Sequence, residues 1–298
     1  FLMALRVRGE TVDEITAAAR VMRAKATHIS APADAIDIVG TGGDASGTLN
    51  ISTGAAIVVA GCGVPIAKHG NRALSSKSGA ADVLMALGVN IDCDMALIEK
   101  SIREAGIGFM MAPRHHSATR HVAGPRVELA TRTVFNILGP LSNPANVDRL
   151  LVGVFAREWV QPMAEVLGKL GARKAWVVHG SDGLDELTTT GPSFVSALEN
   201  GKVTNFEVSP ADAGLPLAKP KDLLGGNAEE NAAAMTAMLA GEESAYRDVV
   251  VYTAAAALVV ADKAADLAEG TRIASAAIYT GKARAALDAM VRITNEGD

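Results

Sequence analysis

The chain has 298 residues, of which 49% are apolar and 20% charged, a balance that is ordinary for a globular protein. Its net charge of −5 excludes a general attraction to nucleic acid or anionic lipid, and its 4% of aromatic residues disfavours a surface on which bases stack. No apolar run is long enough to span a membrane and no signal peptide is visible, so we expect a cytoplasmic protein with no membrane partner. Cys62 and Cys93 lack metal-ligand spacing, so we expect them to be free thiols.

Residues 1–30 are predicted to be helical. Thr11 and Glu14 have the spacing of a capping box, in which each side chain satisfies a backbone amide at the start of a helix, and apolar residues follow at helical spacing. The chain starts at Phe1 without an initiator methionine and within a helical pattern, so we expect that residues preceding it are missing from this sequence.

Beyond residue 34, short apolar runs alternate with helical segments. The runs that predict strands are "IDIVG", "VPIAKHG", "RLLVGVF", "AWVVHG" and "FEVSP". Segments such as "NISTGAAIVVAGCG" and "PMAEVLGKLGA" predict the helices between them, and the chain is mostly helical from about Glu229. This alternation predicts an α/β domain with a mainly parallel central sheet. Between Asp94 and Pro140 we find no strand signal, so helices and loops are expected there.

A glycine-rich segment, "DIVGTGGDASGTLNIST", runs from Asp37 to Thr53, between a strand and a helix. Its glycines permit positive φ and close approach to a ligand, and the amides and partial positive charge of a helix start suit a phosphate. The spacing matches neither the Walker A motif nor the dinucleotide fingerprint. Taken alone, the segment also fits a merely structural turn.

Two further loops follow strands. "KHGNRALSSKSG", from Lys68 to Gly79, combines cations with hydroxyls, which at the carboxyl edge of a parallel sheet predicts an anion site; a solvated loop is the alternative. "VVHGSDGLDEL" carries Asp182, Asp185 and Glu186. Adjacent carboxylates facing a polyphosphate are what Mg²⁺ requires, although an acidic surface turn would look the same.

The segment from Gly108 to Pro144 is rich in histidine and arginine. His115, His116 and His121 do not have the spacing of a zinc site, and the neighbouring arginines Arg120 and Arg126 oppose cation binding. Arginines beside a phosphate site indicate recognition of a carboxylate or a phosphate instead.

Together, "GTGGD", "NIST", "KHGNRALSSKSG", "VELATRTVFNILGPLSNP" and "HGSDGLDEL" closely resemble the anthranilate phosphoribosyltransferase family of tryptophan biosynthesis, from Phe1 to about Asn295. The resemblance implies a small helical domain, here partial (residues 1–33, joined by helices from about 117–140), and a large α/β domain (34–298). It implies a homodimer that transfers phosphoribose from 5-phosphoribosyl 1-diphosphate (PRPP) to anthranilate.

The resemblance also implies roles for individual residues. The expected PRPP site consists of Gly40, Gly43, Asp44, Thr48, Asn50, Ile51, Ser52, Thr53, Lys68, His69, Gly70, Asn71, Arg72, Ala73, Leu74, Ser75 and Ser76. Two Mg²⁺ ions are expected, one held by Ser52 and Glu186 and one by Asp185 and Glu186. The expected anthranilate contacts are Gly40, Asn71, Arg126, His69 and His116, with Gly139 and Pro140 near the entry path.

The chain departs from the family pattern at three positions. Ala80 stands where the family commonly has serine, so we leave it out of the site; Arg114 and His115 stand where we expect asparagine and tyrosine, so the approach channel is expected to differ in detail.

The implied reaction needs no strong base, because an aromatic amine attacks without prior deprotonation; no side chain is therefore expected to be an indispensable general base. Two alternatives remain. A pyrimidine nucleoside phosphorylase shares the architecture but would use phosphate as nucleophile, without the Asp185–Glu186 metal pair. A nucleic-acid-binding relative without transferase activity is disfavoured by the charge of −5.

Overall fold

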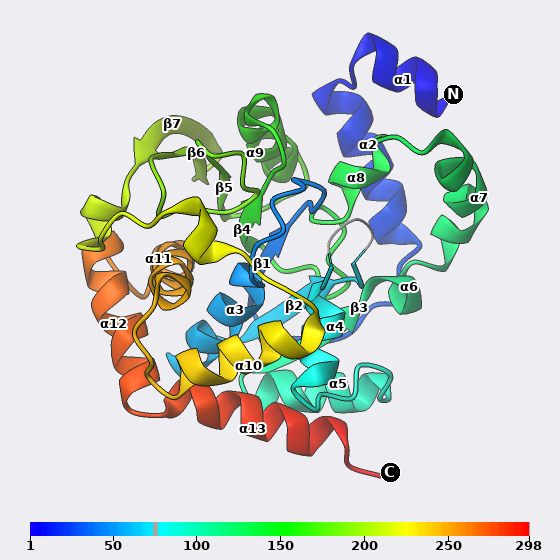
Figure 1. The fold of residues 1–298 in the computed structure, drawn as a ribbon. Coiled ribbons are helices and arrows are strands. Elements are labelled where there is room, and N and C mark those ends of the chain that lie inside the picture. The colour runs from blue at the N-terminus through cyan, green and yellow to red at the C-terminus, as the bar shows by residue number, and fades with distance from the viewer. Residues whose placement is uncertain (74–76, 298) are drawn as a thin grey trace.

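Seven strands form one mixed sheet at the centre of the computed structural model, which describes residues 1–73 and 77–297 (Figure 1). The order across the sheet is β3-β2-β1-β4-β5-β6-β7; β1 to β5 pair in parallel, and β6 and β7 are antiparallel. The strands are β1 (Ile36–Gly40), β2 (Ile66–Gly70), β3 (Ile107–Met111), β4 (Arg149–Gly153), β5 (Lys174–Gly180), β6 (Ser193–Glu199) and β7 (Lys202–Val208).

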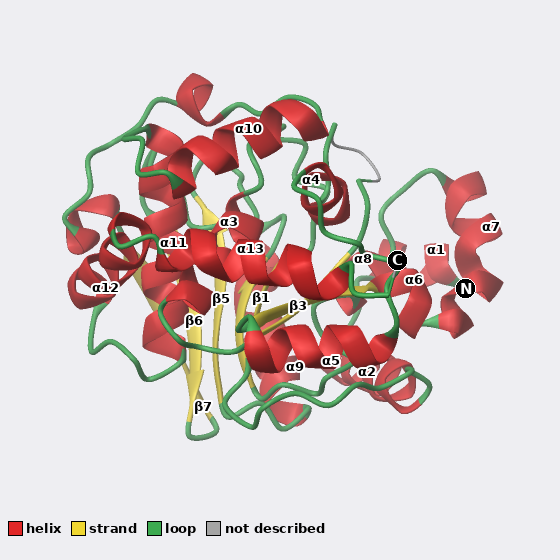
Figure 2. Cartoon of the chain, turned by 90° about the horizontal axis from the view of Figure 1, so that it is seen from below, coloured by secondary structure: helices red, strands yellow, loops and turns green. Residues whose placement is uncertain are grey.

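Helices cover both faces of the sheet, which is why its parallel strands are apolar on both sides (Figure 2). One face is covered by α3 (Ile51–Gly61), α4 (Ala80–Ala86), α10 (Ala228–Leu239), α11 (Ala245–Val260), α12 (Leu267–Tyr279) and α13 (Lys282–Thr294). The other is covered by α2 (Val12–Ala24), α5 (Met95–Glu104) and α9 (Val160–Lys169).

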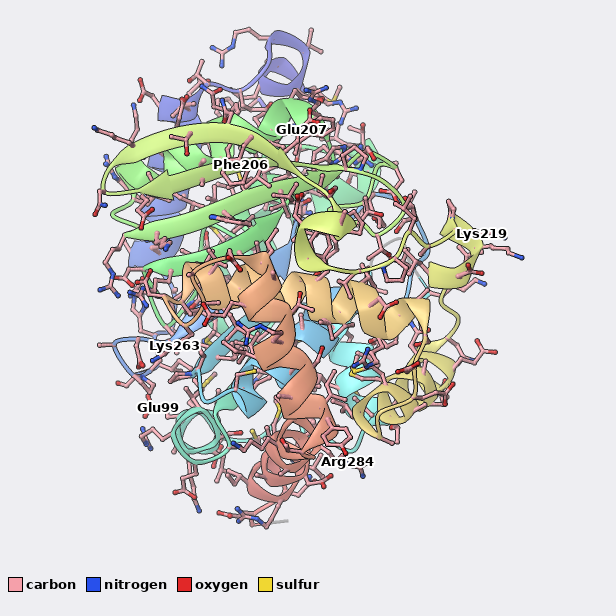
Figure 3. The ribbon with its side chains drawn as sticks, turned by 90° about the vertical axis from the view of Figure 1, so that its left-hand side faces the viewer. Glu99, Phe206, Glu207, Lys219, Lys263 and Arg284 are labelled. Atoms are coloured by element: carbon pink, nitrogen blue, oxygen red, sulfur yellow. The ribbon has the colours of Figure 1, made fainter. Side chains whose placement is uncertain are left out.

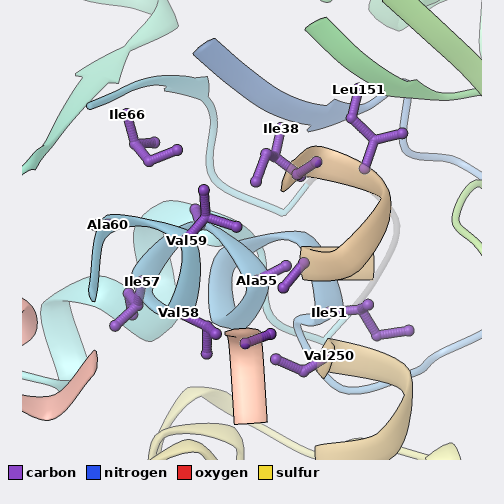
Figure 4. Packing of buried hydrophobic residues seen from close by; sticks show 14 of the residues in the cluster. Ile38, Ile51, Ala55, Ile57, Val58, Val59, Ala60, Ile66, Leu151 and Val250 are labelled. Atoms are coloured by element: carbon purple, nitrogen blue, oxygen red, sulfur yellow. The ribbon is translucent and has the colours of Figure 1, made fainter. Parts of the chain in front are cut away.

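Successive side chains of each strand point to opposite faces of the sheet, so the core consists of two apolar clusters. In β1, Ile38 faces α3, whereas Val39 belongs to the cluster under α9. Figure 4 shows Ile38 and Leu151 above the buried side chains of α3, with Val250 of α11 closing the same cluster. These contacts pack α3 against β1 on one side and α11 on the other.

The remaining helices gather at one end of the molecule. They are α1 (Leu2–Arg8), α6 (Ala112–His115), α7 (Arg120–Leu129) and α8 (Phe135–Leu138). Figure 1 shows α1, α2, α7 and α8 together, beyond the ends of the first strands. A hydrogen bond from the Arg6 guanidinium to the Arg132 carbonyl connects α1 with the segment that follows α7.

The five predicted strands are confirmed, as are the mainly parallel sheet and the mostly helical chain from about Glu229. The capping box is also confirmed: Thr11 Oγ1 accepts the Glu14 amide at 3.3 Å, and Glu14 Oε2 accepts the Thr11 amide at 3.0 Å. The helical prediction for residues 1–30 extends too far, since α2 ends at Ala24.

The predicted absence of strands between Asp94 and Pro140 is wrong, because β3 lies there. Its five residues are all buried, so they show no polar alternation, and they continue directly into α6. β6 was also not predicted; it pairs with β7 at the edge of the sheet, where Phe206 and Glu207 lie on β7 (Figure 3). In the described ranges no helix combines the length and apolar character needed to cross a membrane.

Candidate active site

A cavity of about 380 Å³ opens at the carboxyl ends of the central strands, the edge at which parallel α/β sheets bind ligands. The glycine-rich loop, the start of α3, the loop after β2 and the acidic loop after β5 line it from the sheet side. Met22 of α2, Arg126 of α7 and Phe135 of α8 close the opposite side. The cavity thus lies between the sheet and the helices gathered at the end of the molecule.

A larger hollow of about 550 Å³ lies between α4, α10 and α13, away from these loops. Arg284, which Figure 3 shows on α13, is the cation that lines it, and its Nε donates to Asp288 at 2.8 Å. Because that charge is already paired, the hollow offers less to an anion than the cavity at the strand ends.

The glycine-rich loop is held from two sides. The Gly42 amide, at φ +67°, donates to Asp185 Oδ2 at 2.6 Å. On the other side, the Arg132 guanidinium donates to the Gly43 carbonyl and stacks over the Phe155 ring, 4.3 Å from its centroid. Positive φ at Gly42 and Gly43 is what turns the loop around the cavity.

The start of α3 points into the same cavity. Asn50 occupies the N-cap position of this helix, yet its side chain makes no capping hydrogen bond. The Ser52 amide donates to Glu186 Oε1 at 3.2 Å. The amides of the first turn and the positive end of the helix dipole thus face the acidic loop and any anion bound beside it.

The acidic loop lies unusually close to two strand ends. A Cβ on Gly40 would stand 2.4 Å from Asp185 Oδ2, and one on Gly153 would stand 1.6 Å from the Asp185 carbonyl oxygen. Only glycine at the ends of β1 and β4 leaves room for this approach. Asp182 has a different role: its carboxylate accepts hydrogen bonds from Thr188 and Thr190 hydroxyls at 2.7 and 2.6 Å, which closes the loop.

The charges in this region are buried together. Burial raises the pKa of Asp185, and the adjacent Glu186 raises it further. Burial raises the pKa of Glu186 to about 7, with Lys68 opposing the shift. Burial lowers the pKa of Lys68, while Asp37, Glu186 and Asp185 oppose that change. Two adjacent buried carboxylates remain ionised together only beside more positive charge than Lys68 supplies.

This donor set fits Mg²⁺. The adjacent carboxylates of Asp185 and Glu186 border the cavity, together with the Asp44 carboxylate and the Ser52 hydroxyl, which lies 3.5 Å from Lys68 Nζ. Within residues 1–73 and 77–297, no group of three or more His, Cys, Asp and Glu side chains could hold a metal by itself. Mg²⁺ commonly takes one or two carboxylates and completes its octahedron with water and phosphate oxygens.

His69 and His116 pack edge-on, with ring centroids 5.1 Å apart. His69 Nδ1 lies 3.2 Å from the Gly139 carbonyl oxygen, which can only accept, so Nδ1 carries the proton and Nε2 keeps its lone pair. Burial, and then the neighbouring His116, lower the pKa of His69 to about 3. The ring is therefore neutral at physiological pH.

Three arginines on α7 and directly after it differ in their partners. Arg126 is half-buried in the cavity wall, 5.5 Å from the Phe135 ring centroid, and no carboxylate in the described ranges pairs with it. Arg132 is committed to Gly43, and Arg120 is exposed. Arg126 is thus the guanidinium available to a bound anion.

Arg114 and His115, which depart from the family pattern, are not part of the cavity wall. Arg114 donates to the carbonyls of Ile91 and Cys93 at 3.1 and 2.7 Å, and His115 Nδ1 lies 2.7 Å from the Thr27 carbonyl. Neither residue lines the cavity, because both side chains turn toward the protein interior, whereas Ala80 does line it.

Most of the residues expected from sequence come together around this cavity. The lining includes Gly40, Gly43, Asp44, Thr48, Asn50, Ile51, Ser52, Lys68, His69, Gly70, Asn71, Arg72, Ala73, His116, Arg126, Asp185 and Glu186. Thr53 does not line it; its side chain is buried within α3. Leu74, Ser75 and Ser76 lie outside the described residues.

Several lining residues were missed from sequence, namely Met22, Thr119, Phe135 and Asn136. Phe135 and Asn136 belong to the quoted "VELATRTVFNILGPLSNP" segment, so that motif could have pointed to them. Met22 carries no such signal, because only the packing of α2 against α8 brings it to the cavity.

Because His69 is buried in its neutral form, the free energy of unfolding depends on pH. The unfolded chain binds a proton on this residue below pH 6.5, but the folded chain does not until about pH 3, so stability is full above pH 6.5 and falls as pH decreases. Between pH 6.5 and 5 we expect His69 to account for a loss of about 1.5 kcal/mol in the free energy of unfolding. Urea unfolding at both pH values measures this loss.

His69→Gln should make the pH dependence shallower by that amount, and His121→Gln, at an exposed position, should not. An unchanged slope in His69→Gln would contradict the burial of a neutral ring.

Comparison with known proteins agrees with this geometry. The helical bundle domain of the glycosyl transferase family matches residues 1–26, and its a/b domain matches residues 32–284. The anthranilate phosphoribosyltransferase of Rhodospirillum rubrum is 66% identical over 293 residues, which cover 98% of this chain and 84% of that protein.

Two solved structures have the same fold. The anthranilate phosphoribosyltransferase from Thermus thermophilus aligns with a TM-score of 0.93 at 44% identity, covering 98% of this chain and 88% of that one. The enzyme from Saccharomyces cerevisiae, in complex with PRPP and Mg, aligns with a TM-score of 0.89 at 29% identity, covering 99% and 84%. Sequence identity, family match and fold agree that the chain belongs to the anthranilate phosphoribosyltransferase family.

Proposed function

We propose that this chain transfers the phosphoribosyl group of PRPP to the amino group of anthranilate, giving N-(5-phosphoribosyl)anthranilate and diphosphate, as a step of tryptophan biosynthesis. The observation that carries the proposal is one cavity with two unlike ends. A glycine-rich loop, a helix start and a buried acid pair line one end; Arg126, which pairs with no carboxylate among the described residues, lines the same cavity together with the edge-packed His69 and His116.

The diphosphate of PRPP would lie against the glycine-rich loop, the first turn of α3 and the loop from Lys68 to Ala73. Ser52 with Glu186, and Asp185 with Glu186, would hold two Mg²⁺ ions. Mg²⁺ bound there would neutralise charge on the departing diphosphate. Lys68 and the α3 amides would orient the phosphate oxygens by charge-assisted hydrogen bonds.

Anthranilate would lie at the other end of the cavity. Arg126 would pair with its carboxylate, and Gly40, Asn71, His69 and His116 would surround the ring and its amino group. A guanidinium fork matches a planar carboxylate, which supports this orientation. His69 Nε2, with its free lone pair, can accept a hydrogen bond from an N–H group.

The reaction would break the bond between the anomeric carbon and diphosphate through a transition state of oxocarbenium character. Holding the amine beside that carbon supplies much of the rate, because well-oriented reactants gain roughly 7–11 kcal/mol. A residue with a pKa of about 3, such as His69, is a weak base, which supports a mechanism without an indispensable general base.

The proposal includes a two-domain, homodimeric, cytoplasmic enzyme. Residues 1–33 with 117–140 would form the helical domain, and its closure over the rest of residues 34–298 would exclude water from the activated sugar. Exposed apolar side chains on α1 and α7 support dimerisation through that domain: Val7 and Val127 are 81% and 79% exposed.

Loss of anthranilate fluorescence in the presence of PRPP and Mg²⁺ tests the function, with chelator and no-PRPP controls. No loss at any Mg²⁺ concentration would refute it. Phosphate-dependent cleavage of a pyrimidine nucleoside would identify a phosphorylase, and a salt-dependent DNA gel shift would identify a nucleic-acid-binding relative.

Arg126→Ala should raise the KM for anthranilate about tenfold or more, because a charge-assisted hydrogen bond contributes about 1.5–3 kcal/mol. The KM for PRPP should change little. Arg126→Lys should restore binding only in part, since a point charge lacks the bidentate geometry. Steady-state kinetics with each substrate varied measures the difference.

The matched control is Arg120→Ala, an exposed arginine on the same helix. If Arg126→Ala raises the KM for PRPP and leaves the KM for anthranilate unchanged, then Arg126 contacts phosphate and the proposed division of the cavity is wrong.

A further inference from the structure

Asn50 is joined to two residues of the C-terminal helices. Asn231 Nδ2 of α10 donates to Asn50 Oδ1 at 2.9 Å, and the Tyr246 hydroxyl of α11 donates to the Asn50 carbonyl at 3.1 Å. Asn231 and Tyr246 are 1% and 3% exposed. Neither residue lines the cavity, and neither belongs to a motif quoted from the sequence.

The orientation of the Asn231 amide is determined by a second hydrogen bond. Its Oδ1 accepts the Gly226 amide at 2.8 Å, so its Nδ2 must point toward Asn50. The backbone there is tightly packed: a Cβ on Gly225 would lie 2.9 Å from both Asn231 Oδ1 and the Leu49 amide nitrogen. The donor to Asn50 therefore has little freedom to move.

This arrangement changes what Asn50 does for its own helix. An asparagine at the N-cap ordinarily accepts a hydrogen bond from an amide of the first turn. Here Asn50 Oδ1 accepts a hydrogen bond from Asn231 Nδ2, with Ser78 Oγ a further donor at 3.4 Å, and the Asn50 side chain makes no capping hydrogen bond. The Asn50 oxygen is thereby kept from the amides of the first turn of α3, and the Ser52 amide donates instead to Glu186 Oε1 at 3.2 Å.

Tyr246 acts on the backbone of the same residue. Its hydroxyl lies where a Cβ on Gly54 would come within 3.0 Å, so Tyr246 packs directly against the first turn of α3. Val250, one turn further along α11, continues this contact (Figure 4). The hydroxyl and the packing together determine where α3 begins.

We propose that Asn231 and Tyr246 are positioning residues for the diphosphate cradle, because they hold the Asn50 oxygen away from the first-turn amides of α3, where it would compete with substrate. The inference rests on the proposed function, in which those amides bind the diphosphate of PRPP. Without Asn231, the Asn50 oxygen is free to turn and cap α3, where it competes with the phosphate oxygens for the same donors.

The test compares Asn231→Ala and Tyr246→Phe with the wild type. Asn231→Ala should raise the KM for PRPP about tenfold and Tyr246→Phe about threefold, as expected when a hydrogen bond to a binding group is lost. The KM for anthranilate should stay within about twofold and kcat should fall less than KM rises. Calorimetry with inorganic diphosphate and Mg²⁺ should show the same loss of affinity.

Tyr252→Phe is the matched control. Tyr252 lies on the same helix, is 0% exposed, and its hydroxyl has no hydrogen-bond partner among the described residues. Removing that hydroxyl should leave both KM values and diphosphate binding unchanged, so it separates the contact with Asn50 from a general effect on α11.

Two results would overturn the inference. One is that Asn231→Ala and Tyr246→Phe bind diphosphate as tightly as Tyr252→Phe does. The other is that the KM values for PRPP and anthranilate rise equally and the melting temperature falls. If Asn231→Ala does not fold, Tyr246→Phe decides. A wild-type protein that binds diphosphate but does not consume anthranilate would refute the proposed function, while the binding comparison would still test these residues.

Discussion

Asp185→Asn combined with Glu186→Gln should reduce Mg²⁺-dependent turnover by about 10³-fold or more, because metal stabilisation of a departing diphosphate contributes several kcal/mol. The amides keep the oxygens that accept the Gly42 and Ser52 amides, so the loop should stay in place. Fluorescence assays over a range of Mg²⁺ concentrations measure the loss, and circular dichroism checks the fold.

The same double variant should be at least as stable as the wild type in metal-free buffer at pH 8. Burial raises the pKa of both carboxyl groups, so their ionised forms oppose folding above their folded pKa, which is about 7 for Glu186. Neutral amides remove that cost. Glu207→Gln, at an exposed position on β7, is the control. Turnover equal to wild type at ordinary Mg²⁺ would refute the metal assignment.

Gly153→Ala should reduce turnover by about 10²-fold or more, because a 1 Å displacement of a catalytic group has effects of that size. The new Cβ would stand 1.6 Å from the Asp185 carbonyl oxygen, which is backbone and cannot rotate away. The acidic loop must therefore shift, and the Mg²⁺ concentration for half-maximal activity should rise.

Gly124→Ala provides the comparison. Among the described residues nothing lies within 4 Å of a Cβ at this helical position, and its φ is not positive, so alanine fits. If Gly153→Ala retained full activity with an unchanged Mg²⁺ requirement, the acidic loop would not depend on its contact with β4.

Local signals in the sequence predicted much of the fold. Thr11 and Glu14 begin α2 because a capping box needs only residues three positions apart. Four of the strand runs after residue 34 were recognisable because both faces of a parallel sheet are buried, whereas "FEVSP" overlaps only the end of β7, an exposed antiparallel edge strand. β3 was missed for a related reason: five buried residues that run directly into a helix resemble either element.

The chemistry of the site was also legible in the sequence, because phosphate and Mg²⁺ are bound by residue types that cluster in short loops after strands. Asp185 and Glu186 are adjacent, and the glycines from Gly40 to Gly47 lie at the end of β1 and in the loop that follows it. The resemblance of these motifs to one family predicted the substrates, and membership of that family is confirmed by 66% identity to a known member.

Other features depend on contacts between residues distant in sequence, which only the tertiary structure could decide. Gly153 must be glycine because the backbone of Asp185 crosses it, and Arg114 turns away from the cavity because the carbonyls of Ile91 and Cys93 bind it. Asn231 reaches Asn50 across 181 positions of the chain. Sequence alone determined which groups this protein has for holding phosphate and metal, whereas packing of the helices against the sheet decided which of them meet, since burial and hydrogen-bond geometry arise only when the chain is folded.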